Sequence, residues 1–352
     1  MGDTPGKQRP KLRDIADATG LSLAAVSLAL NGKAGVSAEN RRRVVAAARG
    51  LNYERPSPRG TPPTISVIIE RLPVAIAKDP FNRPILEGLE AAARPLGYRV
   101  AMEFVGPEDH PDRERWADGE TAGVIVLGGG DLGPDWVQTA AAHHLPVVMV
   151  DHFLPGLDLP AVVPDNLAGA YAATRHLQEM GHERIGFIRG PGKYWTLGER
   201  LAGYLLAMQR HGPFPRETLV PPRVSHGEDK GYGEMIALLD LPEPERPTAV
   251  FAVSDKAAIG AYRAARERGL AIPRDVSVVG FDDIEAARVL DPPLTTVHIP
   301  GETIGRVAFE RLHRLIAGME RELPAQMRWA IATRLVERES VAPGPRRPAG
   351  RR

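Results

Sequence analysis

Hydrophobic positions near the start of the chain recur with the period of a helix. In residues 12–19 the apolar side chains are spaced i, i+3 and i+4, and Gly20 can adopt the left-handed conformation that ends a helix. Ser22 and Ser37 are typical N-cap residues, and each precedes a further apolar pattern of the same period. We therefore expect three short helices and no strand in this part of the chain.

A proline-rich stretch, RPSPRGTPPT, follows the third helical pattern, and four of its residues are prolines. Proline lacks the amide donor and restricts the residue before it, so the stretch favours an extended conformation. We therefore place a domain boundary here, with a helical domain at residues 1–54 and a linker at residues 55–63.

From residue 64 onward, short apolar runs alternate with amphipathic helical stretches. Seven runs have the character of strands: ISVII, RVAMEF, AGVIVL, PVVMV, RIGFI, TAVFAV and VSVVGF. Strands separated by helices predict parallel sheets with helices on both faces, and hence an α/β core over residues 64–340. The end of the chain, residues 341–352, is rich in proline and arginine and is expected to be disordered.

Composition narrows the classes of function. The 352 residues include no cysteine, which excludes disulfides, thiol nucleophiles and cysteine-ligated metals. The first residues contain no apolar segment typical of an export signal, and no apolar run approaches the roughly 18 residues of a membrane span. We therefore expect a cytoplasmic protein.

Charge is distributed unevenly despite a net charge of +1. Residues 1–59 carry 11 basic and 5 acidic side chains, whereas the remainder carries 34 and 39. A basic module on a mildly acidic body is expected when one end binds nucleic acid, although a solvated arginine-rich surface would give the same count. Ala16, Gly20 and Val26 are small enough to let the first two helices meet at a steep angle, which fits a helix-turn-helix. The alternative is a three-helix cap without DNA contact.

The sequence shows no pattern that indicates catalysis or a bound cofactor. The ten histidines form no HExxH or related metal-binding spacing. The glycine run at residues 128–130 follows a predicted strand, but GGGDLGPD lacks the frames of phosphate-binding and dinucleotide-binding loops. Because no set of nucleophile, base and orienting residue is evident, we expect neither an enzyme nor a metal or cofactor site.

Beyond these patterns, the chain resembles one family throughout residues 12–340. LRDIADATGLSLAAVSLALNG and VSAENRRRVVAAARGLNY resemble the DNA-binding headpiece of the lactose/galactose repressor (LacI/GalR) family. DPFNRPILEGLEAAARPLGY, VPDNLAGAY, HLQEMGHERIGFIRGP, PTAVFAVSDKAAIGA and GLAIPRDVSVVGFDD continue the resemblance through the core in family order. The resemblance implies a ligand-responsive, sequence-specific transcriptional repressor that binds double-stranded operator DNA as a homodimer.

The resemblance also implies a periplasmic-binding-protein-like core of two Rossmann-like lobes that the chain crosses three times. Lobe one is expected at about residues 64–163 and 292–323, and lobe two at about residues 164–291 and 324–340. The DNA-contacting residues implied in the headpiece are Ser22, Leu23, Ala24, Ser27, Leu28, Asn31, Lys33, Arg41 and Arg42.

Ligand contacts implied by the resemblance lie between the lobes. Asp151 and Asp282 each follow a predicted strand, at the edge where open α/β sheets bind ligands, and Arg200 matches the effector-binding arginine of the family. The other implied contacts are Phe81, Tyr194, Trp195, Thr196 and Ser254. Structural roles remain possible for single residues, since Asp282 could cap a helix, Arg200 could pair with Glu199, and Phe81 could belong to the core.

Two departures from the family pattern concern DNA binding. The family usually has a hinge helix whose leucine enters the minor groove, whereas NYERPSPRGTPP is shorter, broken by prolines and free of leucine. The outward positions Leu23, Ala24 and Leu28 are apolar and offer no bidentate hydrogen bonds to bases. A ligand-binding sensor of the same fold with weak or lost operator specificity is therefore the alternative function. A sugar is the expected effector, with a purine or a phosphorylated sugar left open.

Overall fold

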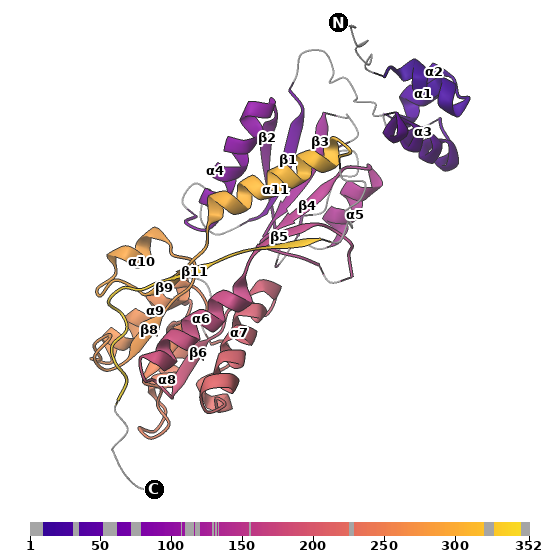
Figure 1. Cartoon of the computed structure of the whole chain (residues 1–352). Coiled ribbons are helices and arrows are strands. Elements are labelled where there is room, and N and C mark those ends of the chain that lie inside the picture. The colour runs from indigo at the N-terminus through magenta and orange to yellow at the C-terminus, as the bar shows by residue number, and fades with distance from the viewer. Residues whose placement is uncertain are drawn as a thin grey trace, which may run out of the picture.

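The computed structural model describes residues 10–30, 35–51, 62–71, 79–106, 108–109, 116, 120–128, 130, 132, 134–154, 156–224, 229–319 and 327–345. These residues form a small helical headpiece and an α/β core of two lobes (Figure 1). The architecture confirms the fold class expected from the sequence. None of the described helices is both long and apolar enough to cross a membrane.

The headpiece consists of three helices around a small apolar core. Helices α1 (Leu12–Thr19), α2 (Leu23–Leu30) and α3 (Ala38–Gly50) surround Ile15, Val26 and Val44, which are fully buried. Gly20 ends α1 with a φ of 67°, in the left-handed region that glycine adopts without strain. The Ser22 and Ser37 hydroxyls accept hydrogen bonds from the third backbone amide after each, at 3.1 and 3.3 Å, and so cap α2 and α3.

Lobe one contains a six-stranded, entirely parallel sheet in the order β10-β5-β4-β3-β1-β2. Its strands are β1 (Thr64–Glu70), β2 (Arg99–Val105), β3 (Thr121–Leu127), β4 (Val147–Val150), β5 (Ala161–Pro164) and β10 (Arg328–Ile331). Successive residues of β1 enter different cores: Val67 and Ile69 pack with α4 (Asn82–Ala93) and α11 (Gly301–Ile316), and Ile68 packs with α5 (Pro134–Ala142). Both faces of the sheet are covered, which explains why β3 and β4 are almost entirely apolar.

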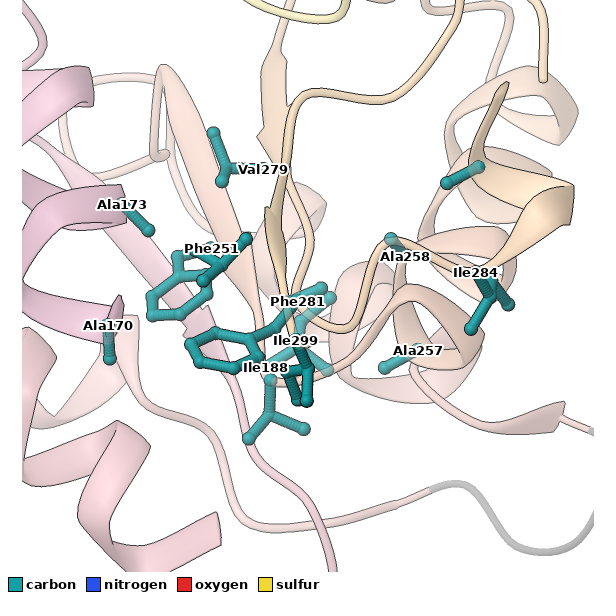
Figure 2. Packing of buried hydrophobic residues seen from close by; sticks show 14 of the residues in the cluster. Ala170, Ala173, Ile188, Phe251, Ala257, Ala258, Val279, Phe281, Ile284 and Ile299 are labelled. Carbon is teal, nitrogen blue, oxygen red and sulfur yellow. The ribbon is translucent and has the colours of Figure 1, made fainter. Parts of the chain in front are cut away.

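Lobe two has a smaller parallel sheet of strands β6 (Ile185–Ile188), β7 (Ala249–Ala252) and β8 (Ser277–Val279), in that order. Its helices are α6 (Asn166–Glu179), α7 (Trp195–His211), α8 (Tyr232–Leu239), α9 (Asp255–Glu267) and α10 (Glu285–Val289). Figure 2 shows Phe251 and Phe281 near Ala170 and Ala173 of α6, while Ala257 and Ala258 of α9 lie on the other side. The aromatic rings fill the interior between sheet and helices.

The segments between the lobes differ from the expected bounds. Residues 294–298, including β9 (Thr296–His298), stay with lobe two, because the Gly280 and Asp282 amides donate to Thr295 and Val297 carbonyls at 2.9 and 2.8 Å. The chain returns to lobe one only at α11, not at residue 292. Likewise β10 pairs with β5, so residues 328–331 extend the sheet of lobe one and do not begin lobe two. Strand β11 (Arg334–Val336) then pairs antiparallel with β9.

The expected disorder after residue 340 is wrong for residues 341–345. The Ala342 amide donates to Ser277 Oγ at 3.1 Å, and the Gly344 amide donates to the Met180 carbonyl at 2.7 Å. These bonds hold the segment against the edge of lobe two, which composition alone does not reveal. The remainder of the expected disordered tail lies outside the described residues.

Candidate ligand-binding cleft

A cavity of about 180 Å³ lies between the two lobes. Lobe one contributes residues at the carboxyl ends of β1, β3 and β4, and lobe two contributes the first turns of α7, α8 and α9. The carboxyl ends of parallel strands and the amino ends of helices are where open α/β folds bind ligands. Seven of the eight residues implied by the resemblance line this cavity: Phe81, Asp151, Tyr194, Thr196, Arg200, Ser254 and Asp282.

Arg200 is the organising side chain of the cavity and is only 2% exposed. Its Nε donates to Asn166 Oδ1 at 2.8 Å, and its Nη1 donates to the Val253 carbonyl at 2.7 Å and to Asp282 Oδ1 at 2.9 Å. Its guanidinium also stacks on Phe281, 3.9 Å from the ring centroid. The alternative partner of Arg200, Glu199, instead pairs with Arg328. These contacts with lobe two therefore fix the position of the Arg200 guanidinium.

Asp151 supplies a carboxylate with unused hydrogen-bonding capacity. Its Oδ1 is shielded from solvent and has no hydrogen-bond partner among the described residues. Burial raises the pKa of Asp151 to about 7, an effect that the nearby Arg200 opposes and Asp282 reinforces. A buried acceptor without a partner is costly unless a ligand donates to it, so Asp151 favours a ligand with hydroxyl or N–H groups.

The backbone at both aspartates is in an uncommon conformation. Asp151 has a φ of 53° and Asp282 a φ of 118°, values that residues with a side chain rarely adopt. Strained backbone conformations are concentrated at functional sites, where they can direct a side chain toward a ligand. Burial raises the pKa of Asp282, whereas its ion pair with Arg200 acts in the opposite direction.

Ser254 and Phe81 have structural partners as well as a place in the cavity. The Ser254 hydroxyl accepts a hydrogen bond from the Ala257 amide at 3.2 Å and caps α9, which leaves its own proton free to be donated. Phe81 is half-buried, precedes α4, and packs partly against the core. Thr196, 3% exposed, lies in the first turn of α7.

Trp195 does not line the cavity, contrary to the expectation. Its side chain is 53% exposed, and its ring packs edge-on against Phe153 of lobe one at 5.6 Å. The helical turn at the start of α7 directs Thr196 inward, and its neighbour therefore points outward. Trp195 contributes to the contact between the lobes.

Two carboxylates of lobe one that bind side chains across the cleft were not predicted from the sequence. Glu70, at the end of β1, accepts hydrogen bonds from Lys193 Nζ at 2.9 Å, Tyr194 Oη at 3.0 Å and the Gly130 amide at 3.1 Å. Asp79 pairs with Lys256 Nζ at 2.9 Å. Glu70 could have been found by the same signal as Asp151, a carboxylate directly after an apolar strand. The position of Asp79 has no comparable signal, because it depends on a contact with the other lobe.

The headpiece presents the start of α2 to solvent. Ser22, Leu23 and Ala24 are exposed, whereas Ser27 and Leu28 are half-buried. Arg42 is exposed, and Arg41 is half-buried with Nη1 3.5 Å from the Ala29 carbonyl. Asn31 and Lys33, the other two expected DNA contacts, lie outside the described residues. Among the described residues no group of three or more histidine, aspartate or glutamate side chains is arranged to hold a metal ion.

Comparison with known proteins gives matches over both parts of the chain. The family described as bacterial regulatory proteins, lacI family, matches residues 11–56, and the periplasmic binding protein-like domain matches residues 174–341. The first match coincides with the headpiece and the second with most of lobe two and the segments that return to lobe one.

Individual relatives extend over nearly the whole chain. The HTH-type transcriptional repressor CytR of Escherichia coli strain K12 is 36% identical over 310 residues, covering 84% of this chain and 87% of CytR. The HTH-type transcriptional regulator MalR of Streptomyces coelicolor is 33% identical over 345 residues, covering 95% and 97%. The solved complex of the transcriptional regulator CelR with cellobiose is 31% identical, with a TM-score of 0.70, over 94% of this chain and 100% of that chain.

Proposed function

Because the chain belongs to the lacI family of bacterial regulatory proteins, we propose that the cleft between its lobes binds the small molecule that controls its affinity for operator DNA. The protein is a ligand-responsive DNA-binding transcriptional regulator, as its relatives are. The observation that carries the proposed site is Arg200, buried at the cleft with three acceptors and beside the unpartnered Oδ1 of Asp151.

The proposed ligand is rich in hydroxyl groups. Arg200 and Ser254 offer donors, Asp151 and Asp282 offer acceptors, and Phe81 offers a ring face on which an apolar face of a sugar or base can lie. The named complex of the relative CelR contains cellobiose, which supports a carbohydrate. A nucleoside combines a hydroxyl-bearing sugar with a flat base, so nucleosides belong in the same screen.

DNA contact is proposed for the exposed start of α2. Leu23 and Ala24 would meet base edges such as thymine methyl groups, while Ser22, Ser27, Leu28, Arg41 and Arg42, together with Asn31 and Lys33, would complete the interface. Two headpieces in a homodimer would bind the two halves of a pseudo-palindromic operator, and the protein would act in the cytoplasm, where that DNA is found.

A thermal-shift screen of sugars and nucleosides tests the proposed site. A ligand at 100 times its Kd stabilises the native state by about 2.7 kcal/mol, which is easily detected. The ligand found should fail to stabilise Arg200→Lys, because lysine cannot reproduce the forked donors, whereas the control Arg175→Lys, outside the cavity, should respond normally. A normal response in both variants would place the ligand elsewhere.

A further inference from the structure

The lobe-two side of the cleft carries a group of cationic side chains that the proposed hydroxyl contacts do not use. Arg223, Lys230 and Lys256 all line the cavity, and Arg189 lines it from the end of β6. They come from three separate segments of the chain, because Arg223 and Lys230 share the connection before α8, so their convergence is a property of the fold and not of a charged run in the sequence.

Ion pairs within the cleft leave part of this positive charge uncompensated. Arg200 is paired with Asp282, and Lys256 is paired with Asp79. Among the described residues, the side chains of Lys230 and Arg189 have no ion-pair or hydrogen-bond partner. Lys230 is exposed at the rim of the cavity, where partial desolvation together with repulsion from Lys256 and Arg223 lowers its pKa and the carboxylate of Asp79 opposes this effect. A bound anion would therefore reduce the electrostatic repulsion between Lys230 and the neighbouring cationic side chains.

Two further carboxylates that line the cavity accept hydrogen bonds from local donors. Glu234 is 1% exposed and its Oε1 accepts a hydrogen bond from the Val224 amide at 3.0 Å. Glu70 accepts hydrogen bonds from Lys193 and Tyr194. Each of these carboxylates is thus held by at least one local donor.

Two helices also begin at this place. Helix α8 has Gly231 as its N-cap and α9 has Ser254, and both N-cap residues line the cavity. Gly231 has a φ of 79°, and a Cβ there would lie 2.2 Å from the Ala257 carbonyl, so the two helix starts pack side by side. The amino end of a helix carries partial positive charge and favours anions, which adds to the field of the side chains.

We propose that the effector carries an anionic substituent, a phosphate or a carboxylate, and that Lys230 and Arg223 bind this group at the lobe-two side of the cleft. The hydroxyl-bearing part of the same molecule then lies against Arg200, Asp151 and Asp282. The inference rests on the proposed function, since it names the chemical class of the ligand for the same cleft.

Calorimetric titration of the full-length protein with matched probes tests the inference. One set is glucose, glucuronate and glucose 6-phosphate, a second is ribose and ribose 5-phosphate, a third is cytidine and cytidine 5′-monophosphate, and inorganic phosphate serves as the bare anion. We expect the anionic member of one set to bind at least tenfold more tightly than its neutral counterpart. Whether glucuronate or glucose 6-phosphate binds in the first set distinguishes carboxylate from phosphate.

Variants of Lys230 test whether this residue causes the preference for anionic probes. Lys230→Met should weaken binding of the preferred anionic probe at least tenfold while changing the Kd of the neutral counterpart less than twofold. Lys230→Arg should retain the preference, and Arg266→Gln, which removes an exposed charge near the end of α9, should change neither Kd.

Three results would overturn the inference: neutral probes that bind as tightly as anionic ones, an anion preference that persists in Lys230→Met, or no binding of any anionic probe. If a neutral sugar alone binds the cleft and changes operator affinity, the proposed function stands and only this inference fails. If no probe of either class affects operator binding, the proposed function itself is in question.

Discussion

Arg200 holds together three groups that would otherwise be buried without a partner. Truncation to alanine should abolish the ligand response and also lower the free energy of unfolding by about 3–5 kcal/mol, because Asp282 loses its counter-charge. Chemical denaturation and ligand titration of Arg200→Ala measure the two effects. The double variant Arg200→Ala/Asp282→Asn should recover part of the stability without recovering the ligand response. Unchanged ligand affinity in Arg200→Ala would contradict the assignment.

Asp151 makes stability depend on pH in a direction opposite to that of a salt-bridged carboxylate. Its pKa rises from 3.8 to about 7 on folding, so between these values the native state holds a proton that the unfolded state releases. The contribution of this bound proton to the free energy of unfolding is therefore fully present below about pH 4 and is lost as the pH rises through 7. Asparagine tolerates a positive φ as aspartate does, so Asp151→Asn isolates the effect of the charge.

Urea denaturation at pH 8 should show Asp151→Asn to be more stable than the parent, by at most about 4 kcal/mol, since one pKa unit corresponds to about 1.4 kcal/mol. The difference should vanish near pH 4, where both proteins are neutral at this position. An equal difference at both pH values would mean that the amide stabilises the site for a reason other than charge.

Residue-scale prediction from the sequence succeeded where a local signal exists. Asp151 and Asp282 follow apolar strands, and Arg200 lies in a recognisable motif, so their place at the cleft could be anticipated. Lys230 and Asp79 have no local signal, because their role depends on which segments the fold brings together. Trp195 points away from the cavity because neighbouring side chains on a helix point in different directions, which a contiguous run of three candidates does not take into account.

At the scale of elements, close helix pairs depend on glycine. A Cβ on Gly305 of α11 would lie 1.8 Å from the Ile85 carbonyl oxygen, and one on Gly88 of α4 would lie 2.1 Å from the Glu302 carbonyl oxygen. The two helices cross with their backbones in contact, and a methyl group must push them apart. The same arrangement occurs in lobe two, where a Cβ on Gly203 of α7 would lie 2.3 Å from the Leu167 carbonyl oxygen.

Gly305→Ala should therefore destabilise the protein by about 1–3 kcal/mol or more, the usual cost of overpacking, and should lower the Tm measured by calorimetry. Gly198→Ala in α7 is the matched control, since its Cβ would meet nothing within 4 Å and alanine is the better helix former. The control should be neutral or slightly stabilising. Equal Tm values for the two variants would show that α4 and α11 can separate without cost.

The linker gives a prediction about DNA, although residues 52–61 lie outside the described part of the structure. Prolines at four positions of RPSPRGTPPT prevent a regular helix, and the stretch supplies no leucine for the minor groove. Operator binding should then depend mainly on phosphate contacts and fall by roughly 10³-fold between 50 and 200 mM salt if about six phosphates are neutralised. Anisotropy titrations across that range measure the dependence, and an operator bend above about 40° would contradict it.

Elements with a strong period were predictable from the sequence, and four short strands were not. All seven apolar runs named from the sequence coincide with strands, and the second and third headpiece helices begin directly after the expected caps Ser22 and Ser37. Strand β5 and the three later strands β9, β10 and β11 were not named. They have only three or four residues each, and β10 alternates exposed and half-buried positions. Their strand character comes from pairing with a distant partner, which also displaced the expected lobe boundaries.

For the whole molecule, the two lobes are joined by contacts that a ligand in the cleft can adjust. Glu70 binds Lys193 and Tyr194, Asp79 binds Lys256, and Phe153 meets Trp195, each across the gap between lobes. A ligand that contacts Asp151 of lobe one and Arg200 of lobe two at once stabilises one relative position of the lobes. Coupling to DNA follows if that position sets the spacing of two headpieces in a dimer.

The most direct test is the affinity of the full-length protein for its cleft ligand, measured by calorimetry without and with saturating operator DNA. Coupling is reciprocal, so the factor by which operator changes the Kd of the ligand must equal the factor by which ligand changes the Kd of the operator. We predict a change of about 5-fold to 150-fold, the usual range of such coupling, in wild type and none in Arg200→Ala. The same ligand Kd with and without operator would contradict the account.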